Sequence, residues 1–215
     1  MDSTPSDSYG KDETALLVID PYNDFLSEGG KLWPFAKEVA EGNGLLDHMR
    51  AVLAAARAQG FRVFIVPHHQ TAPEDYRSWS YLSPTQRRVV ERQTFAVGSW
   101  GAQWHPDFEP RDDEMVVHQH WSSSGFANTD LDFMLKQHGI RKIVLIGMRA
   151  NSCVDTTARF GQELGYHVTL IRDAIGSFSW DEMKATFDTN APLYAHAILT
   201  TSQFLDKLPA RASVA

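Results

Sequence analysis

Short, uninterrupted runs of apolar residues recur along this chain, and they limit its possible folds more than any other feature. The first run, at residues 15–19, reads Ala-Leu-Leu-Val-Ile without a polar residue. A strand with one face in water alternates polar and apolar residues, whereas a strand inside a parallel sheet is covered on both faces and does not. Comparable runs lie at residues 61–66, 115–117, 143–146 and 168–171, with a weaker one at 197–200. These runs predict a six-stranded, mainly parallel sheet.

Helical segments are predicted between these strands, at residues 35–59, 130–138, 152–164 and 181–194. A glycine follows each of the first three, as is common where a helix ends, and Pro192 should end or kink the last one. Alternating strands and helices with right-handed crossovers favour an α/β fold of Rossmann-like topology, a three-layer sandwich with helices on both faces of the sheet. A dinucleotide-binding oxidoreductase shares this alternation, but no Gly-x-Gly-x-x-Gly follows a strand here.

The length of the chain suits one domain. At 215 residues, of which 43% are hydrophobic, the chain can bury one large core but hardly two. Residues 1–12 are rich in Ser, Asp and Pro and are expected to form a flexible tail before a single domain at 13–215. Within that domain, residues 67–114 show no clear pattern of strand or helix, and we expect a long functional insertion or lid there.

The charge of the chain narrows its possible partners. The formal net charge of -7 offers no basic face for nucleic acid or anionic lipid, and no apolar run reaches the roughly 20 residues of a membrane span. A small-molecule substrate is therefore expected, with neither nucleic acid nor membrane as partner. The single cysteine cannot form an internal disulfide, and the polar, acidic first residues do not resemble a signal peptide. These features predict a reducing, cytoplasmic location.

Asp20 and Cys153 stand where the chemistry of such a fold is expected. Asp20 directly follows the first strand, and Cys153 lies in a short link between a strand and a helix. Ligands of open α/β sheets bind outside the carboxyl ends of the strands. The first turn of a helix also offers unpaired N–H groups that stabilise a thiolate and can bind an oxyanion. We therefore interpret Cys153 as a nucleophile and Asp20 as its proton acceptor; the alternative is a small buried cysteine and a capping aspartate.

Three motifs carry a resemblance to a known family. In chain order they read LLVIDPYNDF from Leu16, GFANTDL from Gly125 and GMRANSCV from Gly147. With them, the chain resembles the isochorismatase-like family of cysteine hydrolases, which also contains nicotinamidases and carbamoyl-group amidohydrolases, over about residues 14–207. Any one motif would be weak, but three in the right order are specific.

The resemblance implies a function and a set of site residues. It implies hydrolysis of a small cyclic or aromatic amide-type C–N bond through a thioester on Cys153, with Asp20 as the catalytic aspartate. It also implies a cis Met148–Arg149 peptide bond, oxyanion donors in the backbone N–H groups of Arg149 and Cys153, and a homo-oligomer, either a dimer or a tetramer. Cleavage of a vinyl ether by the aspartate without the thiol, and a non-catalytic relative that binds a ligand, remain open as alternatives.

The catalytic lysine of the family is missing from this sequence. Counting back six positions from Phe126 gives His120, whereas counting forward from the preceding strand gives Gln119. Both residues are therefore candidates for the vacant role. A histidine at this place could hold a positive charge near the thiolate, but not the permanent charge of lysine.

No metal or other cofactor is expected. Nicotinamidases carry an Asp-x-His metal motif after the second strand, but here the corresponding segment reads Val-Pro-His68-His69, and adjacent histidines on an extended segment point in different directions. We expect substrate contacts from four residues instead: Phe25, His69, Trp121 and Phe126. Core packing is the alternative role for the aromatic ones. The side chain of Arg149 could read a substrate carboxylate or extend into solvent.

Overall fold

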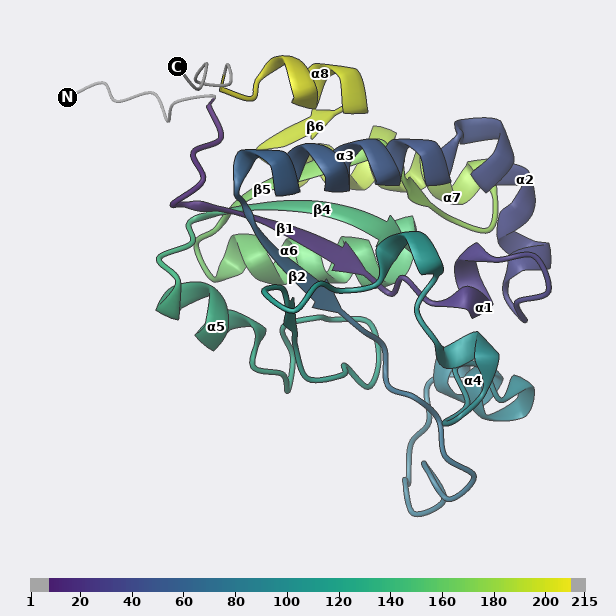
Figure 1. Cartoon of the computed structure of the whole chain (residues 1–215). Coiled ribbons are helices and arrows are strands. Elements are labelled where there is room, and N and C mark those ends of the chain that lie inside the picture. The colour runs from purple at the N-terminus through teal and green to yellow at the C-terminus, as the bar shows by residue number, and fades with distance from the viewer. Residues whose placement is uncertain (1–7, 210–215) are drawn as a thin grey trace.

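Six parallel strands form the centre of the computed structural model, which describes residues 8–209 (Figure 1). In the order β3-β2-β1-β4-β5-β6, every neighbouring pair of strands is parallel. All residues of the central strands β1 and β4 are buried, which explains their uninterrupted apolar sequences. The predicted six-stranded sheet is confirmed, and it is parallel throughout. The strands are β1 (Thr14–Ile19), β2 (Arg62–Val66), β3 (Met115–Val116), β4 (Lys142–Met148), β5 (His167–Gly176) and β6 (Ala197–Leu199).

Helices cover both faces of this sheet and confirm the three-layer sandwich. On one face, the core includes buried residues of α2 (Trp33–Asn43), α3 (Leu45–Gln59) and α8 (Thr201–Asp206). On the other face, it includes residues of α5 (Leu131–Gln137), α6 (Asp155–Glu163) and α7 (Trp180–Lys184). Figure 1 shows α3 on one side of the strands and α5 and α6 on the other.

Two predicted helices are interrupted. The helix expected at 35–59 is in fact α2 and α3, because Gly44 adopts a left-handed conformation with φ of 65° and turns the chain between them. The helix expected at 181–194 continues beyond α7 as a π-helical turn, η4 (Ala185–Asn190), and a 3-10 turn, η5 (Ala191–Leu193). Pro192 lies in η5, where the helical pattern ends as expected.

The segment 67–114 contains a helix that was not predicted, α4 (Pro84–Arg92). Its charged sequence lacks an apolar stripe, but its start carries a capping box. Ser83 Oγ accepts a hydrogen bond from the backbone N–H of Gln86, and the Gln86 side chain accepts one from the N–H of Ser83. The Ser-Pro-Thr-Gln sequence could therefore have revealed this helix. The segment is also anchored to the core, because the Phe95 N–H donates to Asp24 Oδ2 at 2.7 Å.

The packed part of the chain begins before residue 13. The Tyr9 ring is buried and lies 5.1 Å, centre to centre, from that of Phe204, and its hydroxyl is 2.9 Å from Thr169 Oγ1. The flexible tail expected at residues 1–12 therefore cannot include Tyr9, which is packed against the core. Residues 1–7 lie outside the described range. Within residues 8–209, no helix is long and apolar enough to cross a membrane.

Candidate active site

The site lies at the carboxyl ends of β1 and β4, which are neighbours at the centre of the sheet. The strand order reverses its direction between these two strands, and ligand crevices form at such a switch point. Asp20 follows β1 with a positive φ of 52°, and Cys153 lies in a π-helical turn after β4, η3 (Ala150–Val154). The Met148–Arg149 peptide bond that leads into this turn is cis, as expected.

His120 joins Asp20 and Cys153 in one buried cluster. A ring nitrogen of His120, a carboxylate oxygen of Asp20 and Cys153 Sγ all lie within 4.8 Å of one another. Asp20 and His120 are fully buried, and Cys153 is 6% exposed. Of the two candidates for the missing lysine, the fold therefore brings His120 to the thiol. The side chain of the other candidate, Gln119, instead accepts a hydrogen bond from the backbone N–H of Gln70 at 2.9 Å.

Backbone pairing decides which of these two neighbours faces the site. The His120 N–H donates to the carbonyl of Pro67 at 2.9 Å, and the His69 N–H donates to the carbonyl of His120 at 2.8 Å. This short parallel bridge extends the β2–β3 edge beyond the strands. Successive side chains of an extended segment point to opposite sides, so placing His120 inward directs Gln119 away.

The hydrogen bonds of His120 show how many protons the cluster holds. Nδ1 lies 3.0 Å from the carbonyl oxygen of Ser122, which can only accept, so Nδ1 carries a proton. Nε2 lies 3.0 Å from Asp20 Oδ1, and a hydrogen bond there needs a second proton on one of the two atoms. The pair is thus an imidazolium with a carboxylate, or an imidazole with a carboxylic acid, and its net charge is zero in either case.

Asp20 keeps one oxygen available for further chemistry. Its Oδ2 atom is buried and has no hydrogen-bond partner among residues 8–209. A buried carboxylate oxygen without a donor is costly, which is typical of a functional position. Since Cys153 is the neighbouring proton source, Oδ2 is the acceptor available to its thiol.

The surroundings of Cys153 raise the pKa of its thiol. Burial is the main cause that raises its pKa well above the ordinary value, and the negative charge of Asp20 raises it further. This raised pKa opposes the stabilisation of a thiolate that is expected from the start of the helix. The thiolate would form when the thiol transfers its proton to Asp20.

The rate of alkylation tests whether the pKa of the thiol is raised, because Cys153 is the only cysteine and no other thiol can react. A raised pKa means less thiolate at neutral pH, so iodoacetamide should react with the folded protein at a rate that still climbs above about pH 9. Intact mass spectrometry would give the rate at each pH, with the urea-unfolded protein as the exposed-thiol control. A folded-state rate that levels off below about pH 8 would show a thiolate at rest.

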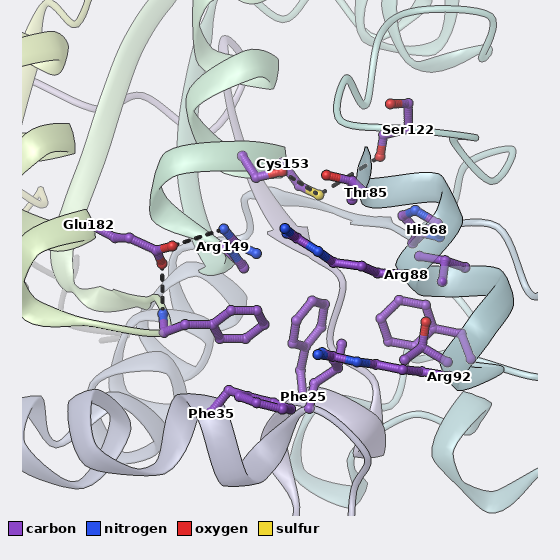
Figure 2. A pocket seen from close by; sticks show the side chains of 16 residues that line it. Phe25, Phe35, His68, Thr85, Arg88, Arg92, Ser122, Arg149, Cys153 and Glu182 are labelled. Carbon is purple, nitrogen blue, oxygen red and sulfur yellow. Dashed lines mark hydrogen bonds and ion pairs between the residues drawn. The ribbon is translucent and has the colours of Figure 1, made fainter. Parts of the chain in front are cut away.

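A cavity of about 210 Å³ opens over Cys153 (Figure 2). Its apolar wall consists of Phe25, Leu32, Phe35, Val89, Phe95 and Phe178. Its polar wall includes His68, Thr85, Arg88, Arg92, Ser122, Arg149, Ser152 and Glu182. Such a mixture suits a small molecule with an apolar body and a few polar groups. The α4 residues were not predicted because nothing in the sequence connects residues 84–92 with Cys153.

Of the four expected substrate contacts, only Phe25 lines this cavity. His69 Nε2 lies 2.7 Å from Asp75 Oδ2, and its ring stacks on Trp121 with 3.6 Å between ring centres. Phe126 is buried in the core. Being close to a motif in sequence does not decide which side of the backbone a ring takes. His69, Trp121 and Phe126 do not line the cavity, and their contacts with substrate stay predictions.

The histidines after β2 do not converge on a shared metal site. His68 Nδ1 lies 3.0 Å from the carbonyl oxygen of its neighbour His69, whose own ring is engaged by Asp75. Burial, with the nearby His120 as the second cause, lowers the pKa of His68 to about 4, so this ring is neutral at pH 7. In the described part of the chain, the one group of three side chains that could hold a metal ion is Asp20, His120 and Cys153. A metal there would occupy the thiol itself, and the absence of a cofactor stays a prediction.

Comparison with known proteins adds three findings. The model of the Isochorismatase domain matches residues 14–203. A ureidoacrylate amidohydrolase RutB from Klebsiella pneumoniae is 29% identical over 177 residues, which cover 78% of this chain and 75% of the relative. The protein of the same name from Pseudomonas savastanoi pv. phaseolicola is 30% identical over 172 residues, which cover 75% of this chain and 70% of the relative.

A solved structure agrees with the fold. The cysteine hydrolase from Pseudomonas syringae pv. phaseolicola matches with a TM-score of 0.78 and 23% identity, and the match covers 93% of each chain. At this identity the likeness concerns the fold alone. The arrangement of strands and helices around the carboxyl ends of β1 and β4 is thus a known one.

Proposed function

Because this chain belongs to the isochorismatase family of hydrolases, we propose that it hydrolyses an amide-type C–N bond in a small cyclic or aromatic molecule through a thioester on Cys153. The observation that carries this proposal is the buried cluster of Asp20, His120 and Cys153 at the base of a cavity. The relatives named amidohydrolases support a C–N bond as the target.

In the first half of the reaction, the thiol of Cys153 gives its proton to Asp20 Oδ2, and the sulfur attacks the substrate carbonyl carbon. The oxyanion that forms accepts hydrogen bonds from the backbone N–H groups of Arg149 and Cys153, each worth about 3 kcal/mol of the barrier. The C–N bond then breaks, and the leaving nitrogen takes the proton from Asp20. The products of this half are the free amine and a thioester on Cys153.

In the second half, water attacks the thioester and gives a proton to Asp20. The C–S bond breaks, the acid product leaves, and Asp20 returns the proton to the sulfur. Every bond that forms on the enzyme is broken again, so the cycle needs only water as a co-reactant.

His120 is a positioning residue in this scheme. Its hydrogen bond to Asp20 Oδ1 orients the carboxylate so that Oδ2 remains available to the thiol. In this scheme His120 replaces the lysine of the family. Its ring is held in place by the hydrogen bond from Nδ1 to the carbonyl oxygen of Ser122.

Three further properties belong to the same proposal. The enzyme would act without a cofactor, as a homo-oligomeric dimer or tetramer, and in the cytoplasm. The family resemblance supports the first two, and the single cysteine is in keeping with a reducing compartment.

The test is an incubation with a panel of aryl amides, carbamoyl compounds and isochorismate, followed by release of amine or ammonia and by intact mass. We expect turnover of at least one C–N compound and, after rapid acid quenching, an added acyl mass located on Cys153. Absence of both turnover and adduct across the panel would contradict the proposal and favour a non-catalytic relative.

A further inference from the structure

The cavity over Cys153 carries positive charge in an otherwise acidic protein. The chain has a formal net charge of -7, yet three arginines and only one acidic residue line this cavity: Arg88, Arg92, Arg149 and Glu182. A concave site with an excess of one sign of charge concentrates small molecules of the opposite sign. The charges of this cavity thus differ in sign from those of the rest of the chain.

The one acidic residue is already engaged. Glu182 Oε1 accepts a hydrogen bond from Arg149 Nη2 at 3.2 Å, while Oε2 accepts bonds from Ser177 Oγ and from the Phe178 N–H. The Arg149 guanidinium also lies over the Phe178 ring, 4.2 Å from its centre. Arg149 and Glu182 therefore neutralise each other, and Arg149 is not free to read a substrate carboxylate.

The two arginines of α4 that line the cavity have no such partner. Among the described residues, neither Arg88 nor Arg92 forms an ion pair with a carboxylate, and the guanidinium of Arg92 lies over the Phe35 ring, 4.6 Å from its centre. In Figure 2 both side chains extend from α4 across the cavity, and Arg88 points toward the region of Arg149 and Cys153. Burial is the main cause that lowers the pKa of Arg149, and the positive charge of Arg88 is a further one, which agrees with their closeness.

The spacing of the lining residues on α4 supports a specific role for these arginines. Thr85, Arg88, Val89 and Arg92 line the cavity, and positions three, four and seven apart share one face of a helix. Of these four residues, Val89 is buried, whereas Thr85, Arg88 and Arg92 line the cavity and are also exposed to solvent. Arg87 on the same helix does not line the cavity, although it is exposed like Arg88 and Arg92, so two of the three arginines of α4 reach the cavity.

We propose that the substrate is an anionic amide or ureido compound whose carboxylate is bound by Arg88, with Arg92 as a second cation, while its C–N group reaches Cys153. The inference rests on the function proposed above and adds the chemical class of the substrate. A guanidinium presents two parallel N–H donors that match a carboxylate, and the apolar wall can hold the body of the molecule. The helix α4, in the segment 67–114, thereby selects acids over neutral amides.

A matched pair of compounds tests the inference: 4-ureidobenzoate and its neutral analogue 4-ureidoacetophenone. The variant is Arg88→Gln and the control is Arg87→Gln, which removes an equal charge from the outer face of the same helix. We expect the wild type to favour the acid, and Arg88→Gln to lower kcat/KM for the acid by about 10- to 100-fold, mainly through KM. Activity on the ketone should stay within about twofold, Arg92→Gln should have a smaller effect in the same direction, and Arg87→Gln should change neither compound.

Calorimetric titration of the Cys153→Ala protein with the same pair separates this inference from the proposed function. The acid should bind, the ketone should bind more weakly, and Arg88→Gln in that background should remove the difference. Equal binding of both compounds, no binding of the acid, or an equal loss for both in Arg88→Gln would overturn the carboxylate site. None of these results bears on the thioester, which the mass of Cys153 reports independently.

Discussion

Replacement of Cys153 by alanine is expected to lower kcat/KM by at least about a thousandfold and to abolish the acyl adduct. In the proposed reaction the sulfur forms and later breaks the only covalent bond between enzyme and substrate, and no neighbouring group of the cluster can take its place. Substrate binding should survive, because the cavity walls lie on other elements, with Phe25 on α1 (Asn23–Leu26) and Arg88 on α4.

Kinetics and binding together decide this prediction. Cys153→Ser is the matched variant, since it keeps a hydroxyl that is a far weaker nucleophile than a thiol, and it should be almost as inactive. Circular dichroism and thermal melting would check that both variants fold. If Cys153→Ala kept full activity, the thiol would not be the nucleophile, and cleavage of a vinyl ether by Asp20 would become the better hypothesis.

Asp20→Asn should lower kcat by about 100- to 10,000-fold, because an amide cannot take the thiol proton or return it to the leaving nitrogen. Asparagine has nearly the shape of aspartate and can still form a hydrogen bond with His120. The loss should therefore fall mainly on kcat rather than on KM, and steady-state kinetics on an active panel compound would measure it.

The same variant should change the thiol in the opposite direction. The negative charge of Asp20 is one of the causes that raise the pKa of Cys153, so its removal should lower that pKa and speed alkylation at about pH 8 while turnover falls. Asp75→Asn is the control, since this carboxylate pairs with His69 outside the cavity and should affect neither measurement. Full turnover in Asp20→Asn would show that another group accepts the proton.

Most of the sheet could be predicted because its strands are covered on both faces. Complete burial removes polar residues from β1 and β4, so the strands appear in the sequence as uninterrupted apolar runs. The helices could be predicted less completely than the strands. A single glycine such as Gly44 hardly disturbs the helical periodicity of the sequence. Its left-handed conformation nevertheless separates α2 from α3. The helix α4 lacks an apolar stripe, so only its cap could have indicated it.

The candidate site could be predicted in part. Asp20 and Cys153 follow β1 and β4 directly, and the ends of neighbouring parallel strands must meet, so their approach follows from the strands themselves. His120 and Gln119 could not be separated, because their loop has no periodicity and only the bridge to Pro67 gives its orientation. The positions of His69, Trp121 and Phe126 away from the cavity could not be predicted for the same reason.

The sequence by itself thus determined the buried strands, the turn that carries Cys153 and the position of Asp20 directly after a strand, because each depends on residues adjacent in the chain. Only the tertiary structure decided that His120 completes the cluster, that burial raises the pKa of the thiol, and that Arg88 lines the cavity of Cys153. Those three features depend on burial and on contacts between segments far apart in sequence, which local patterns do not encode.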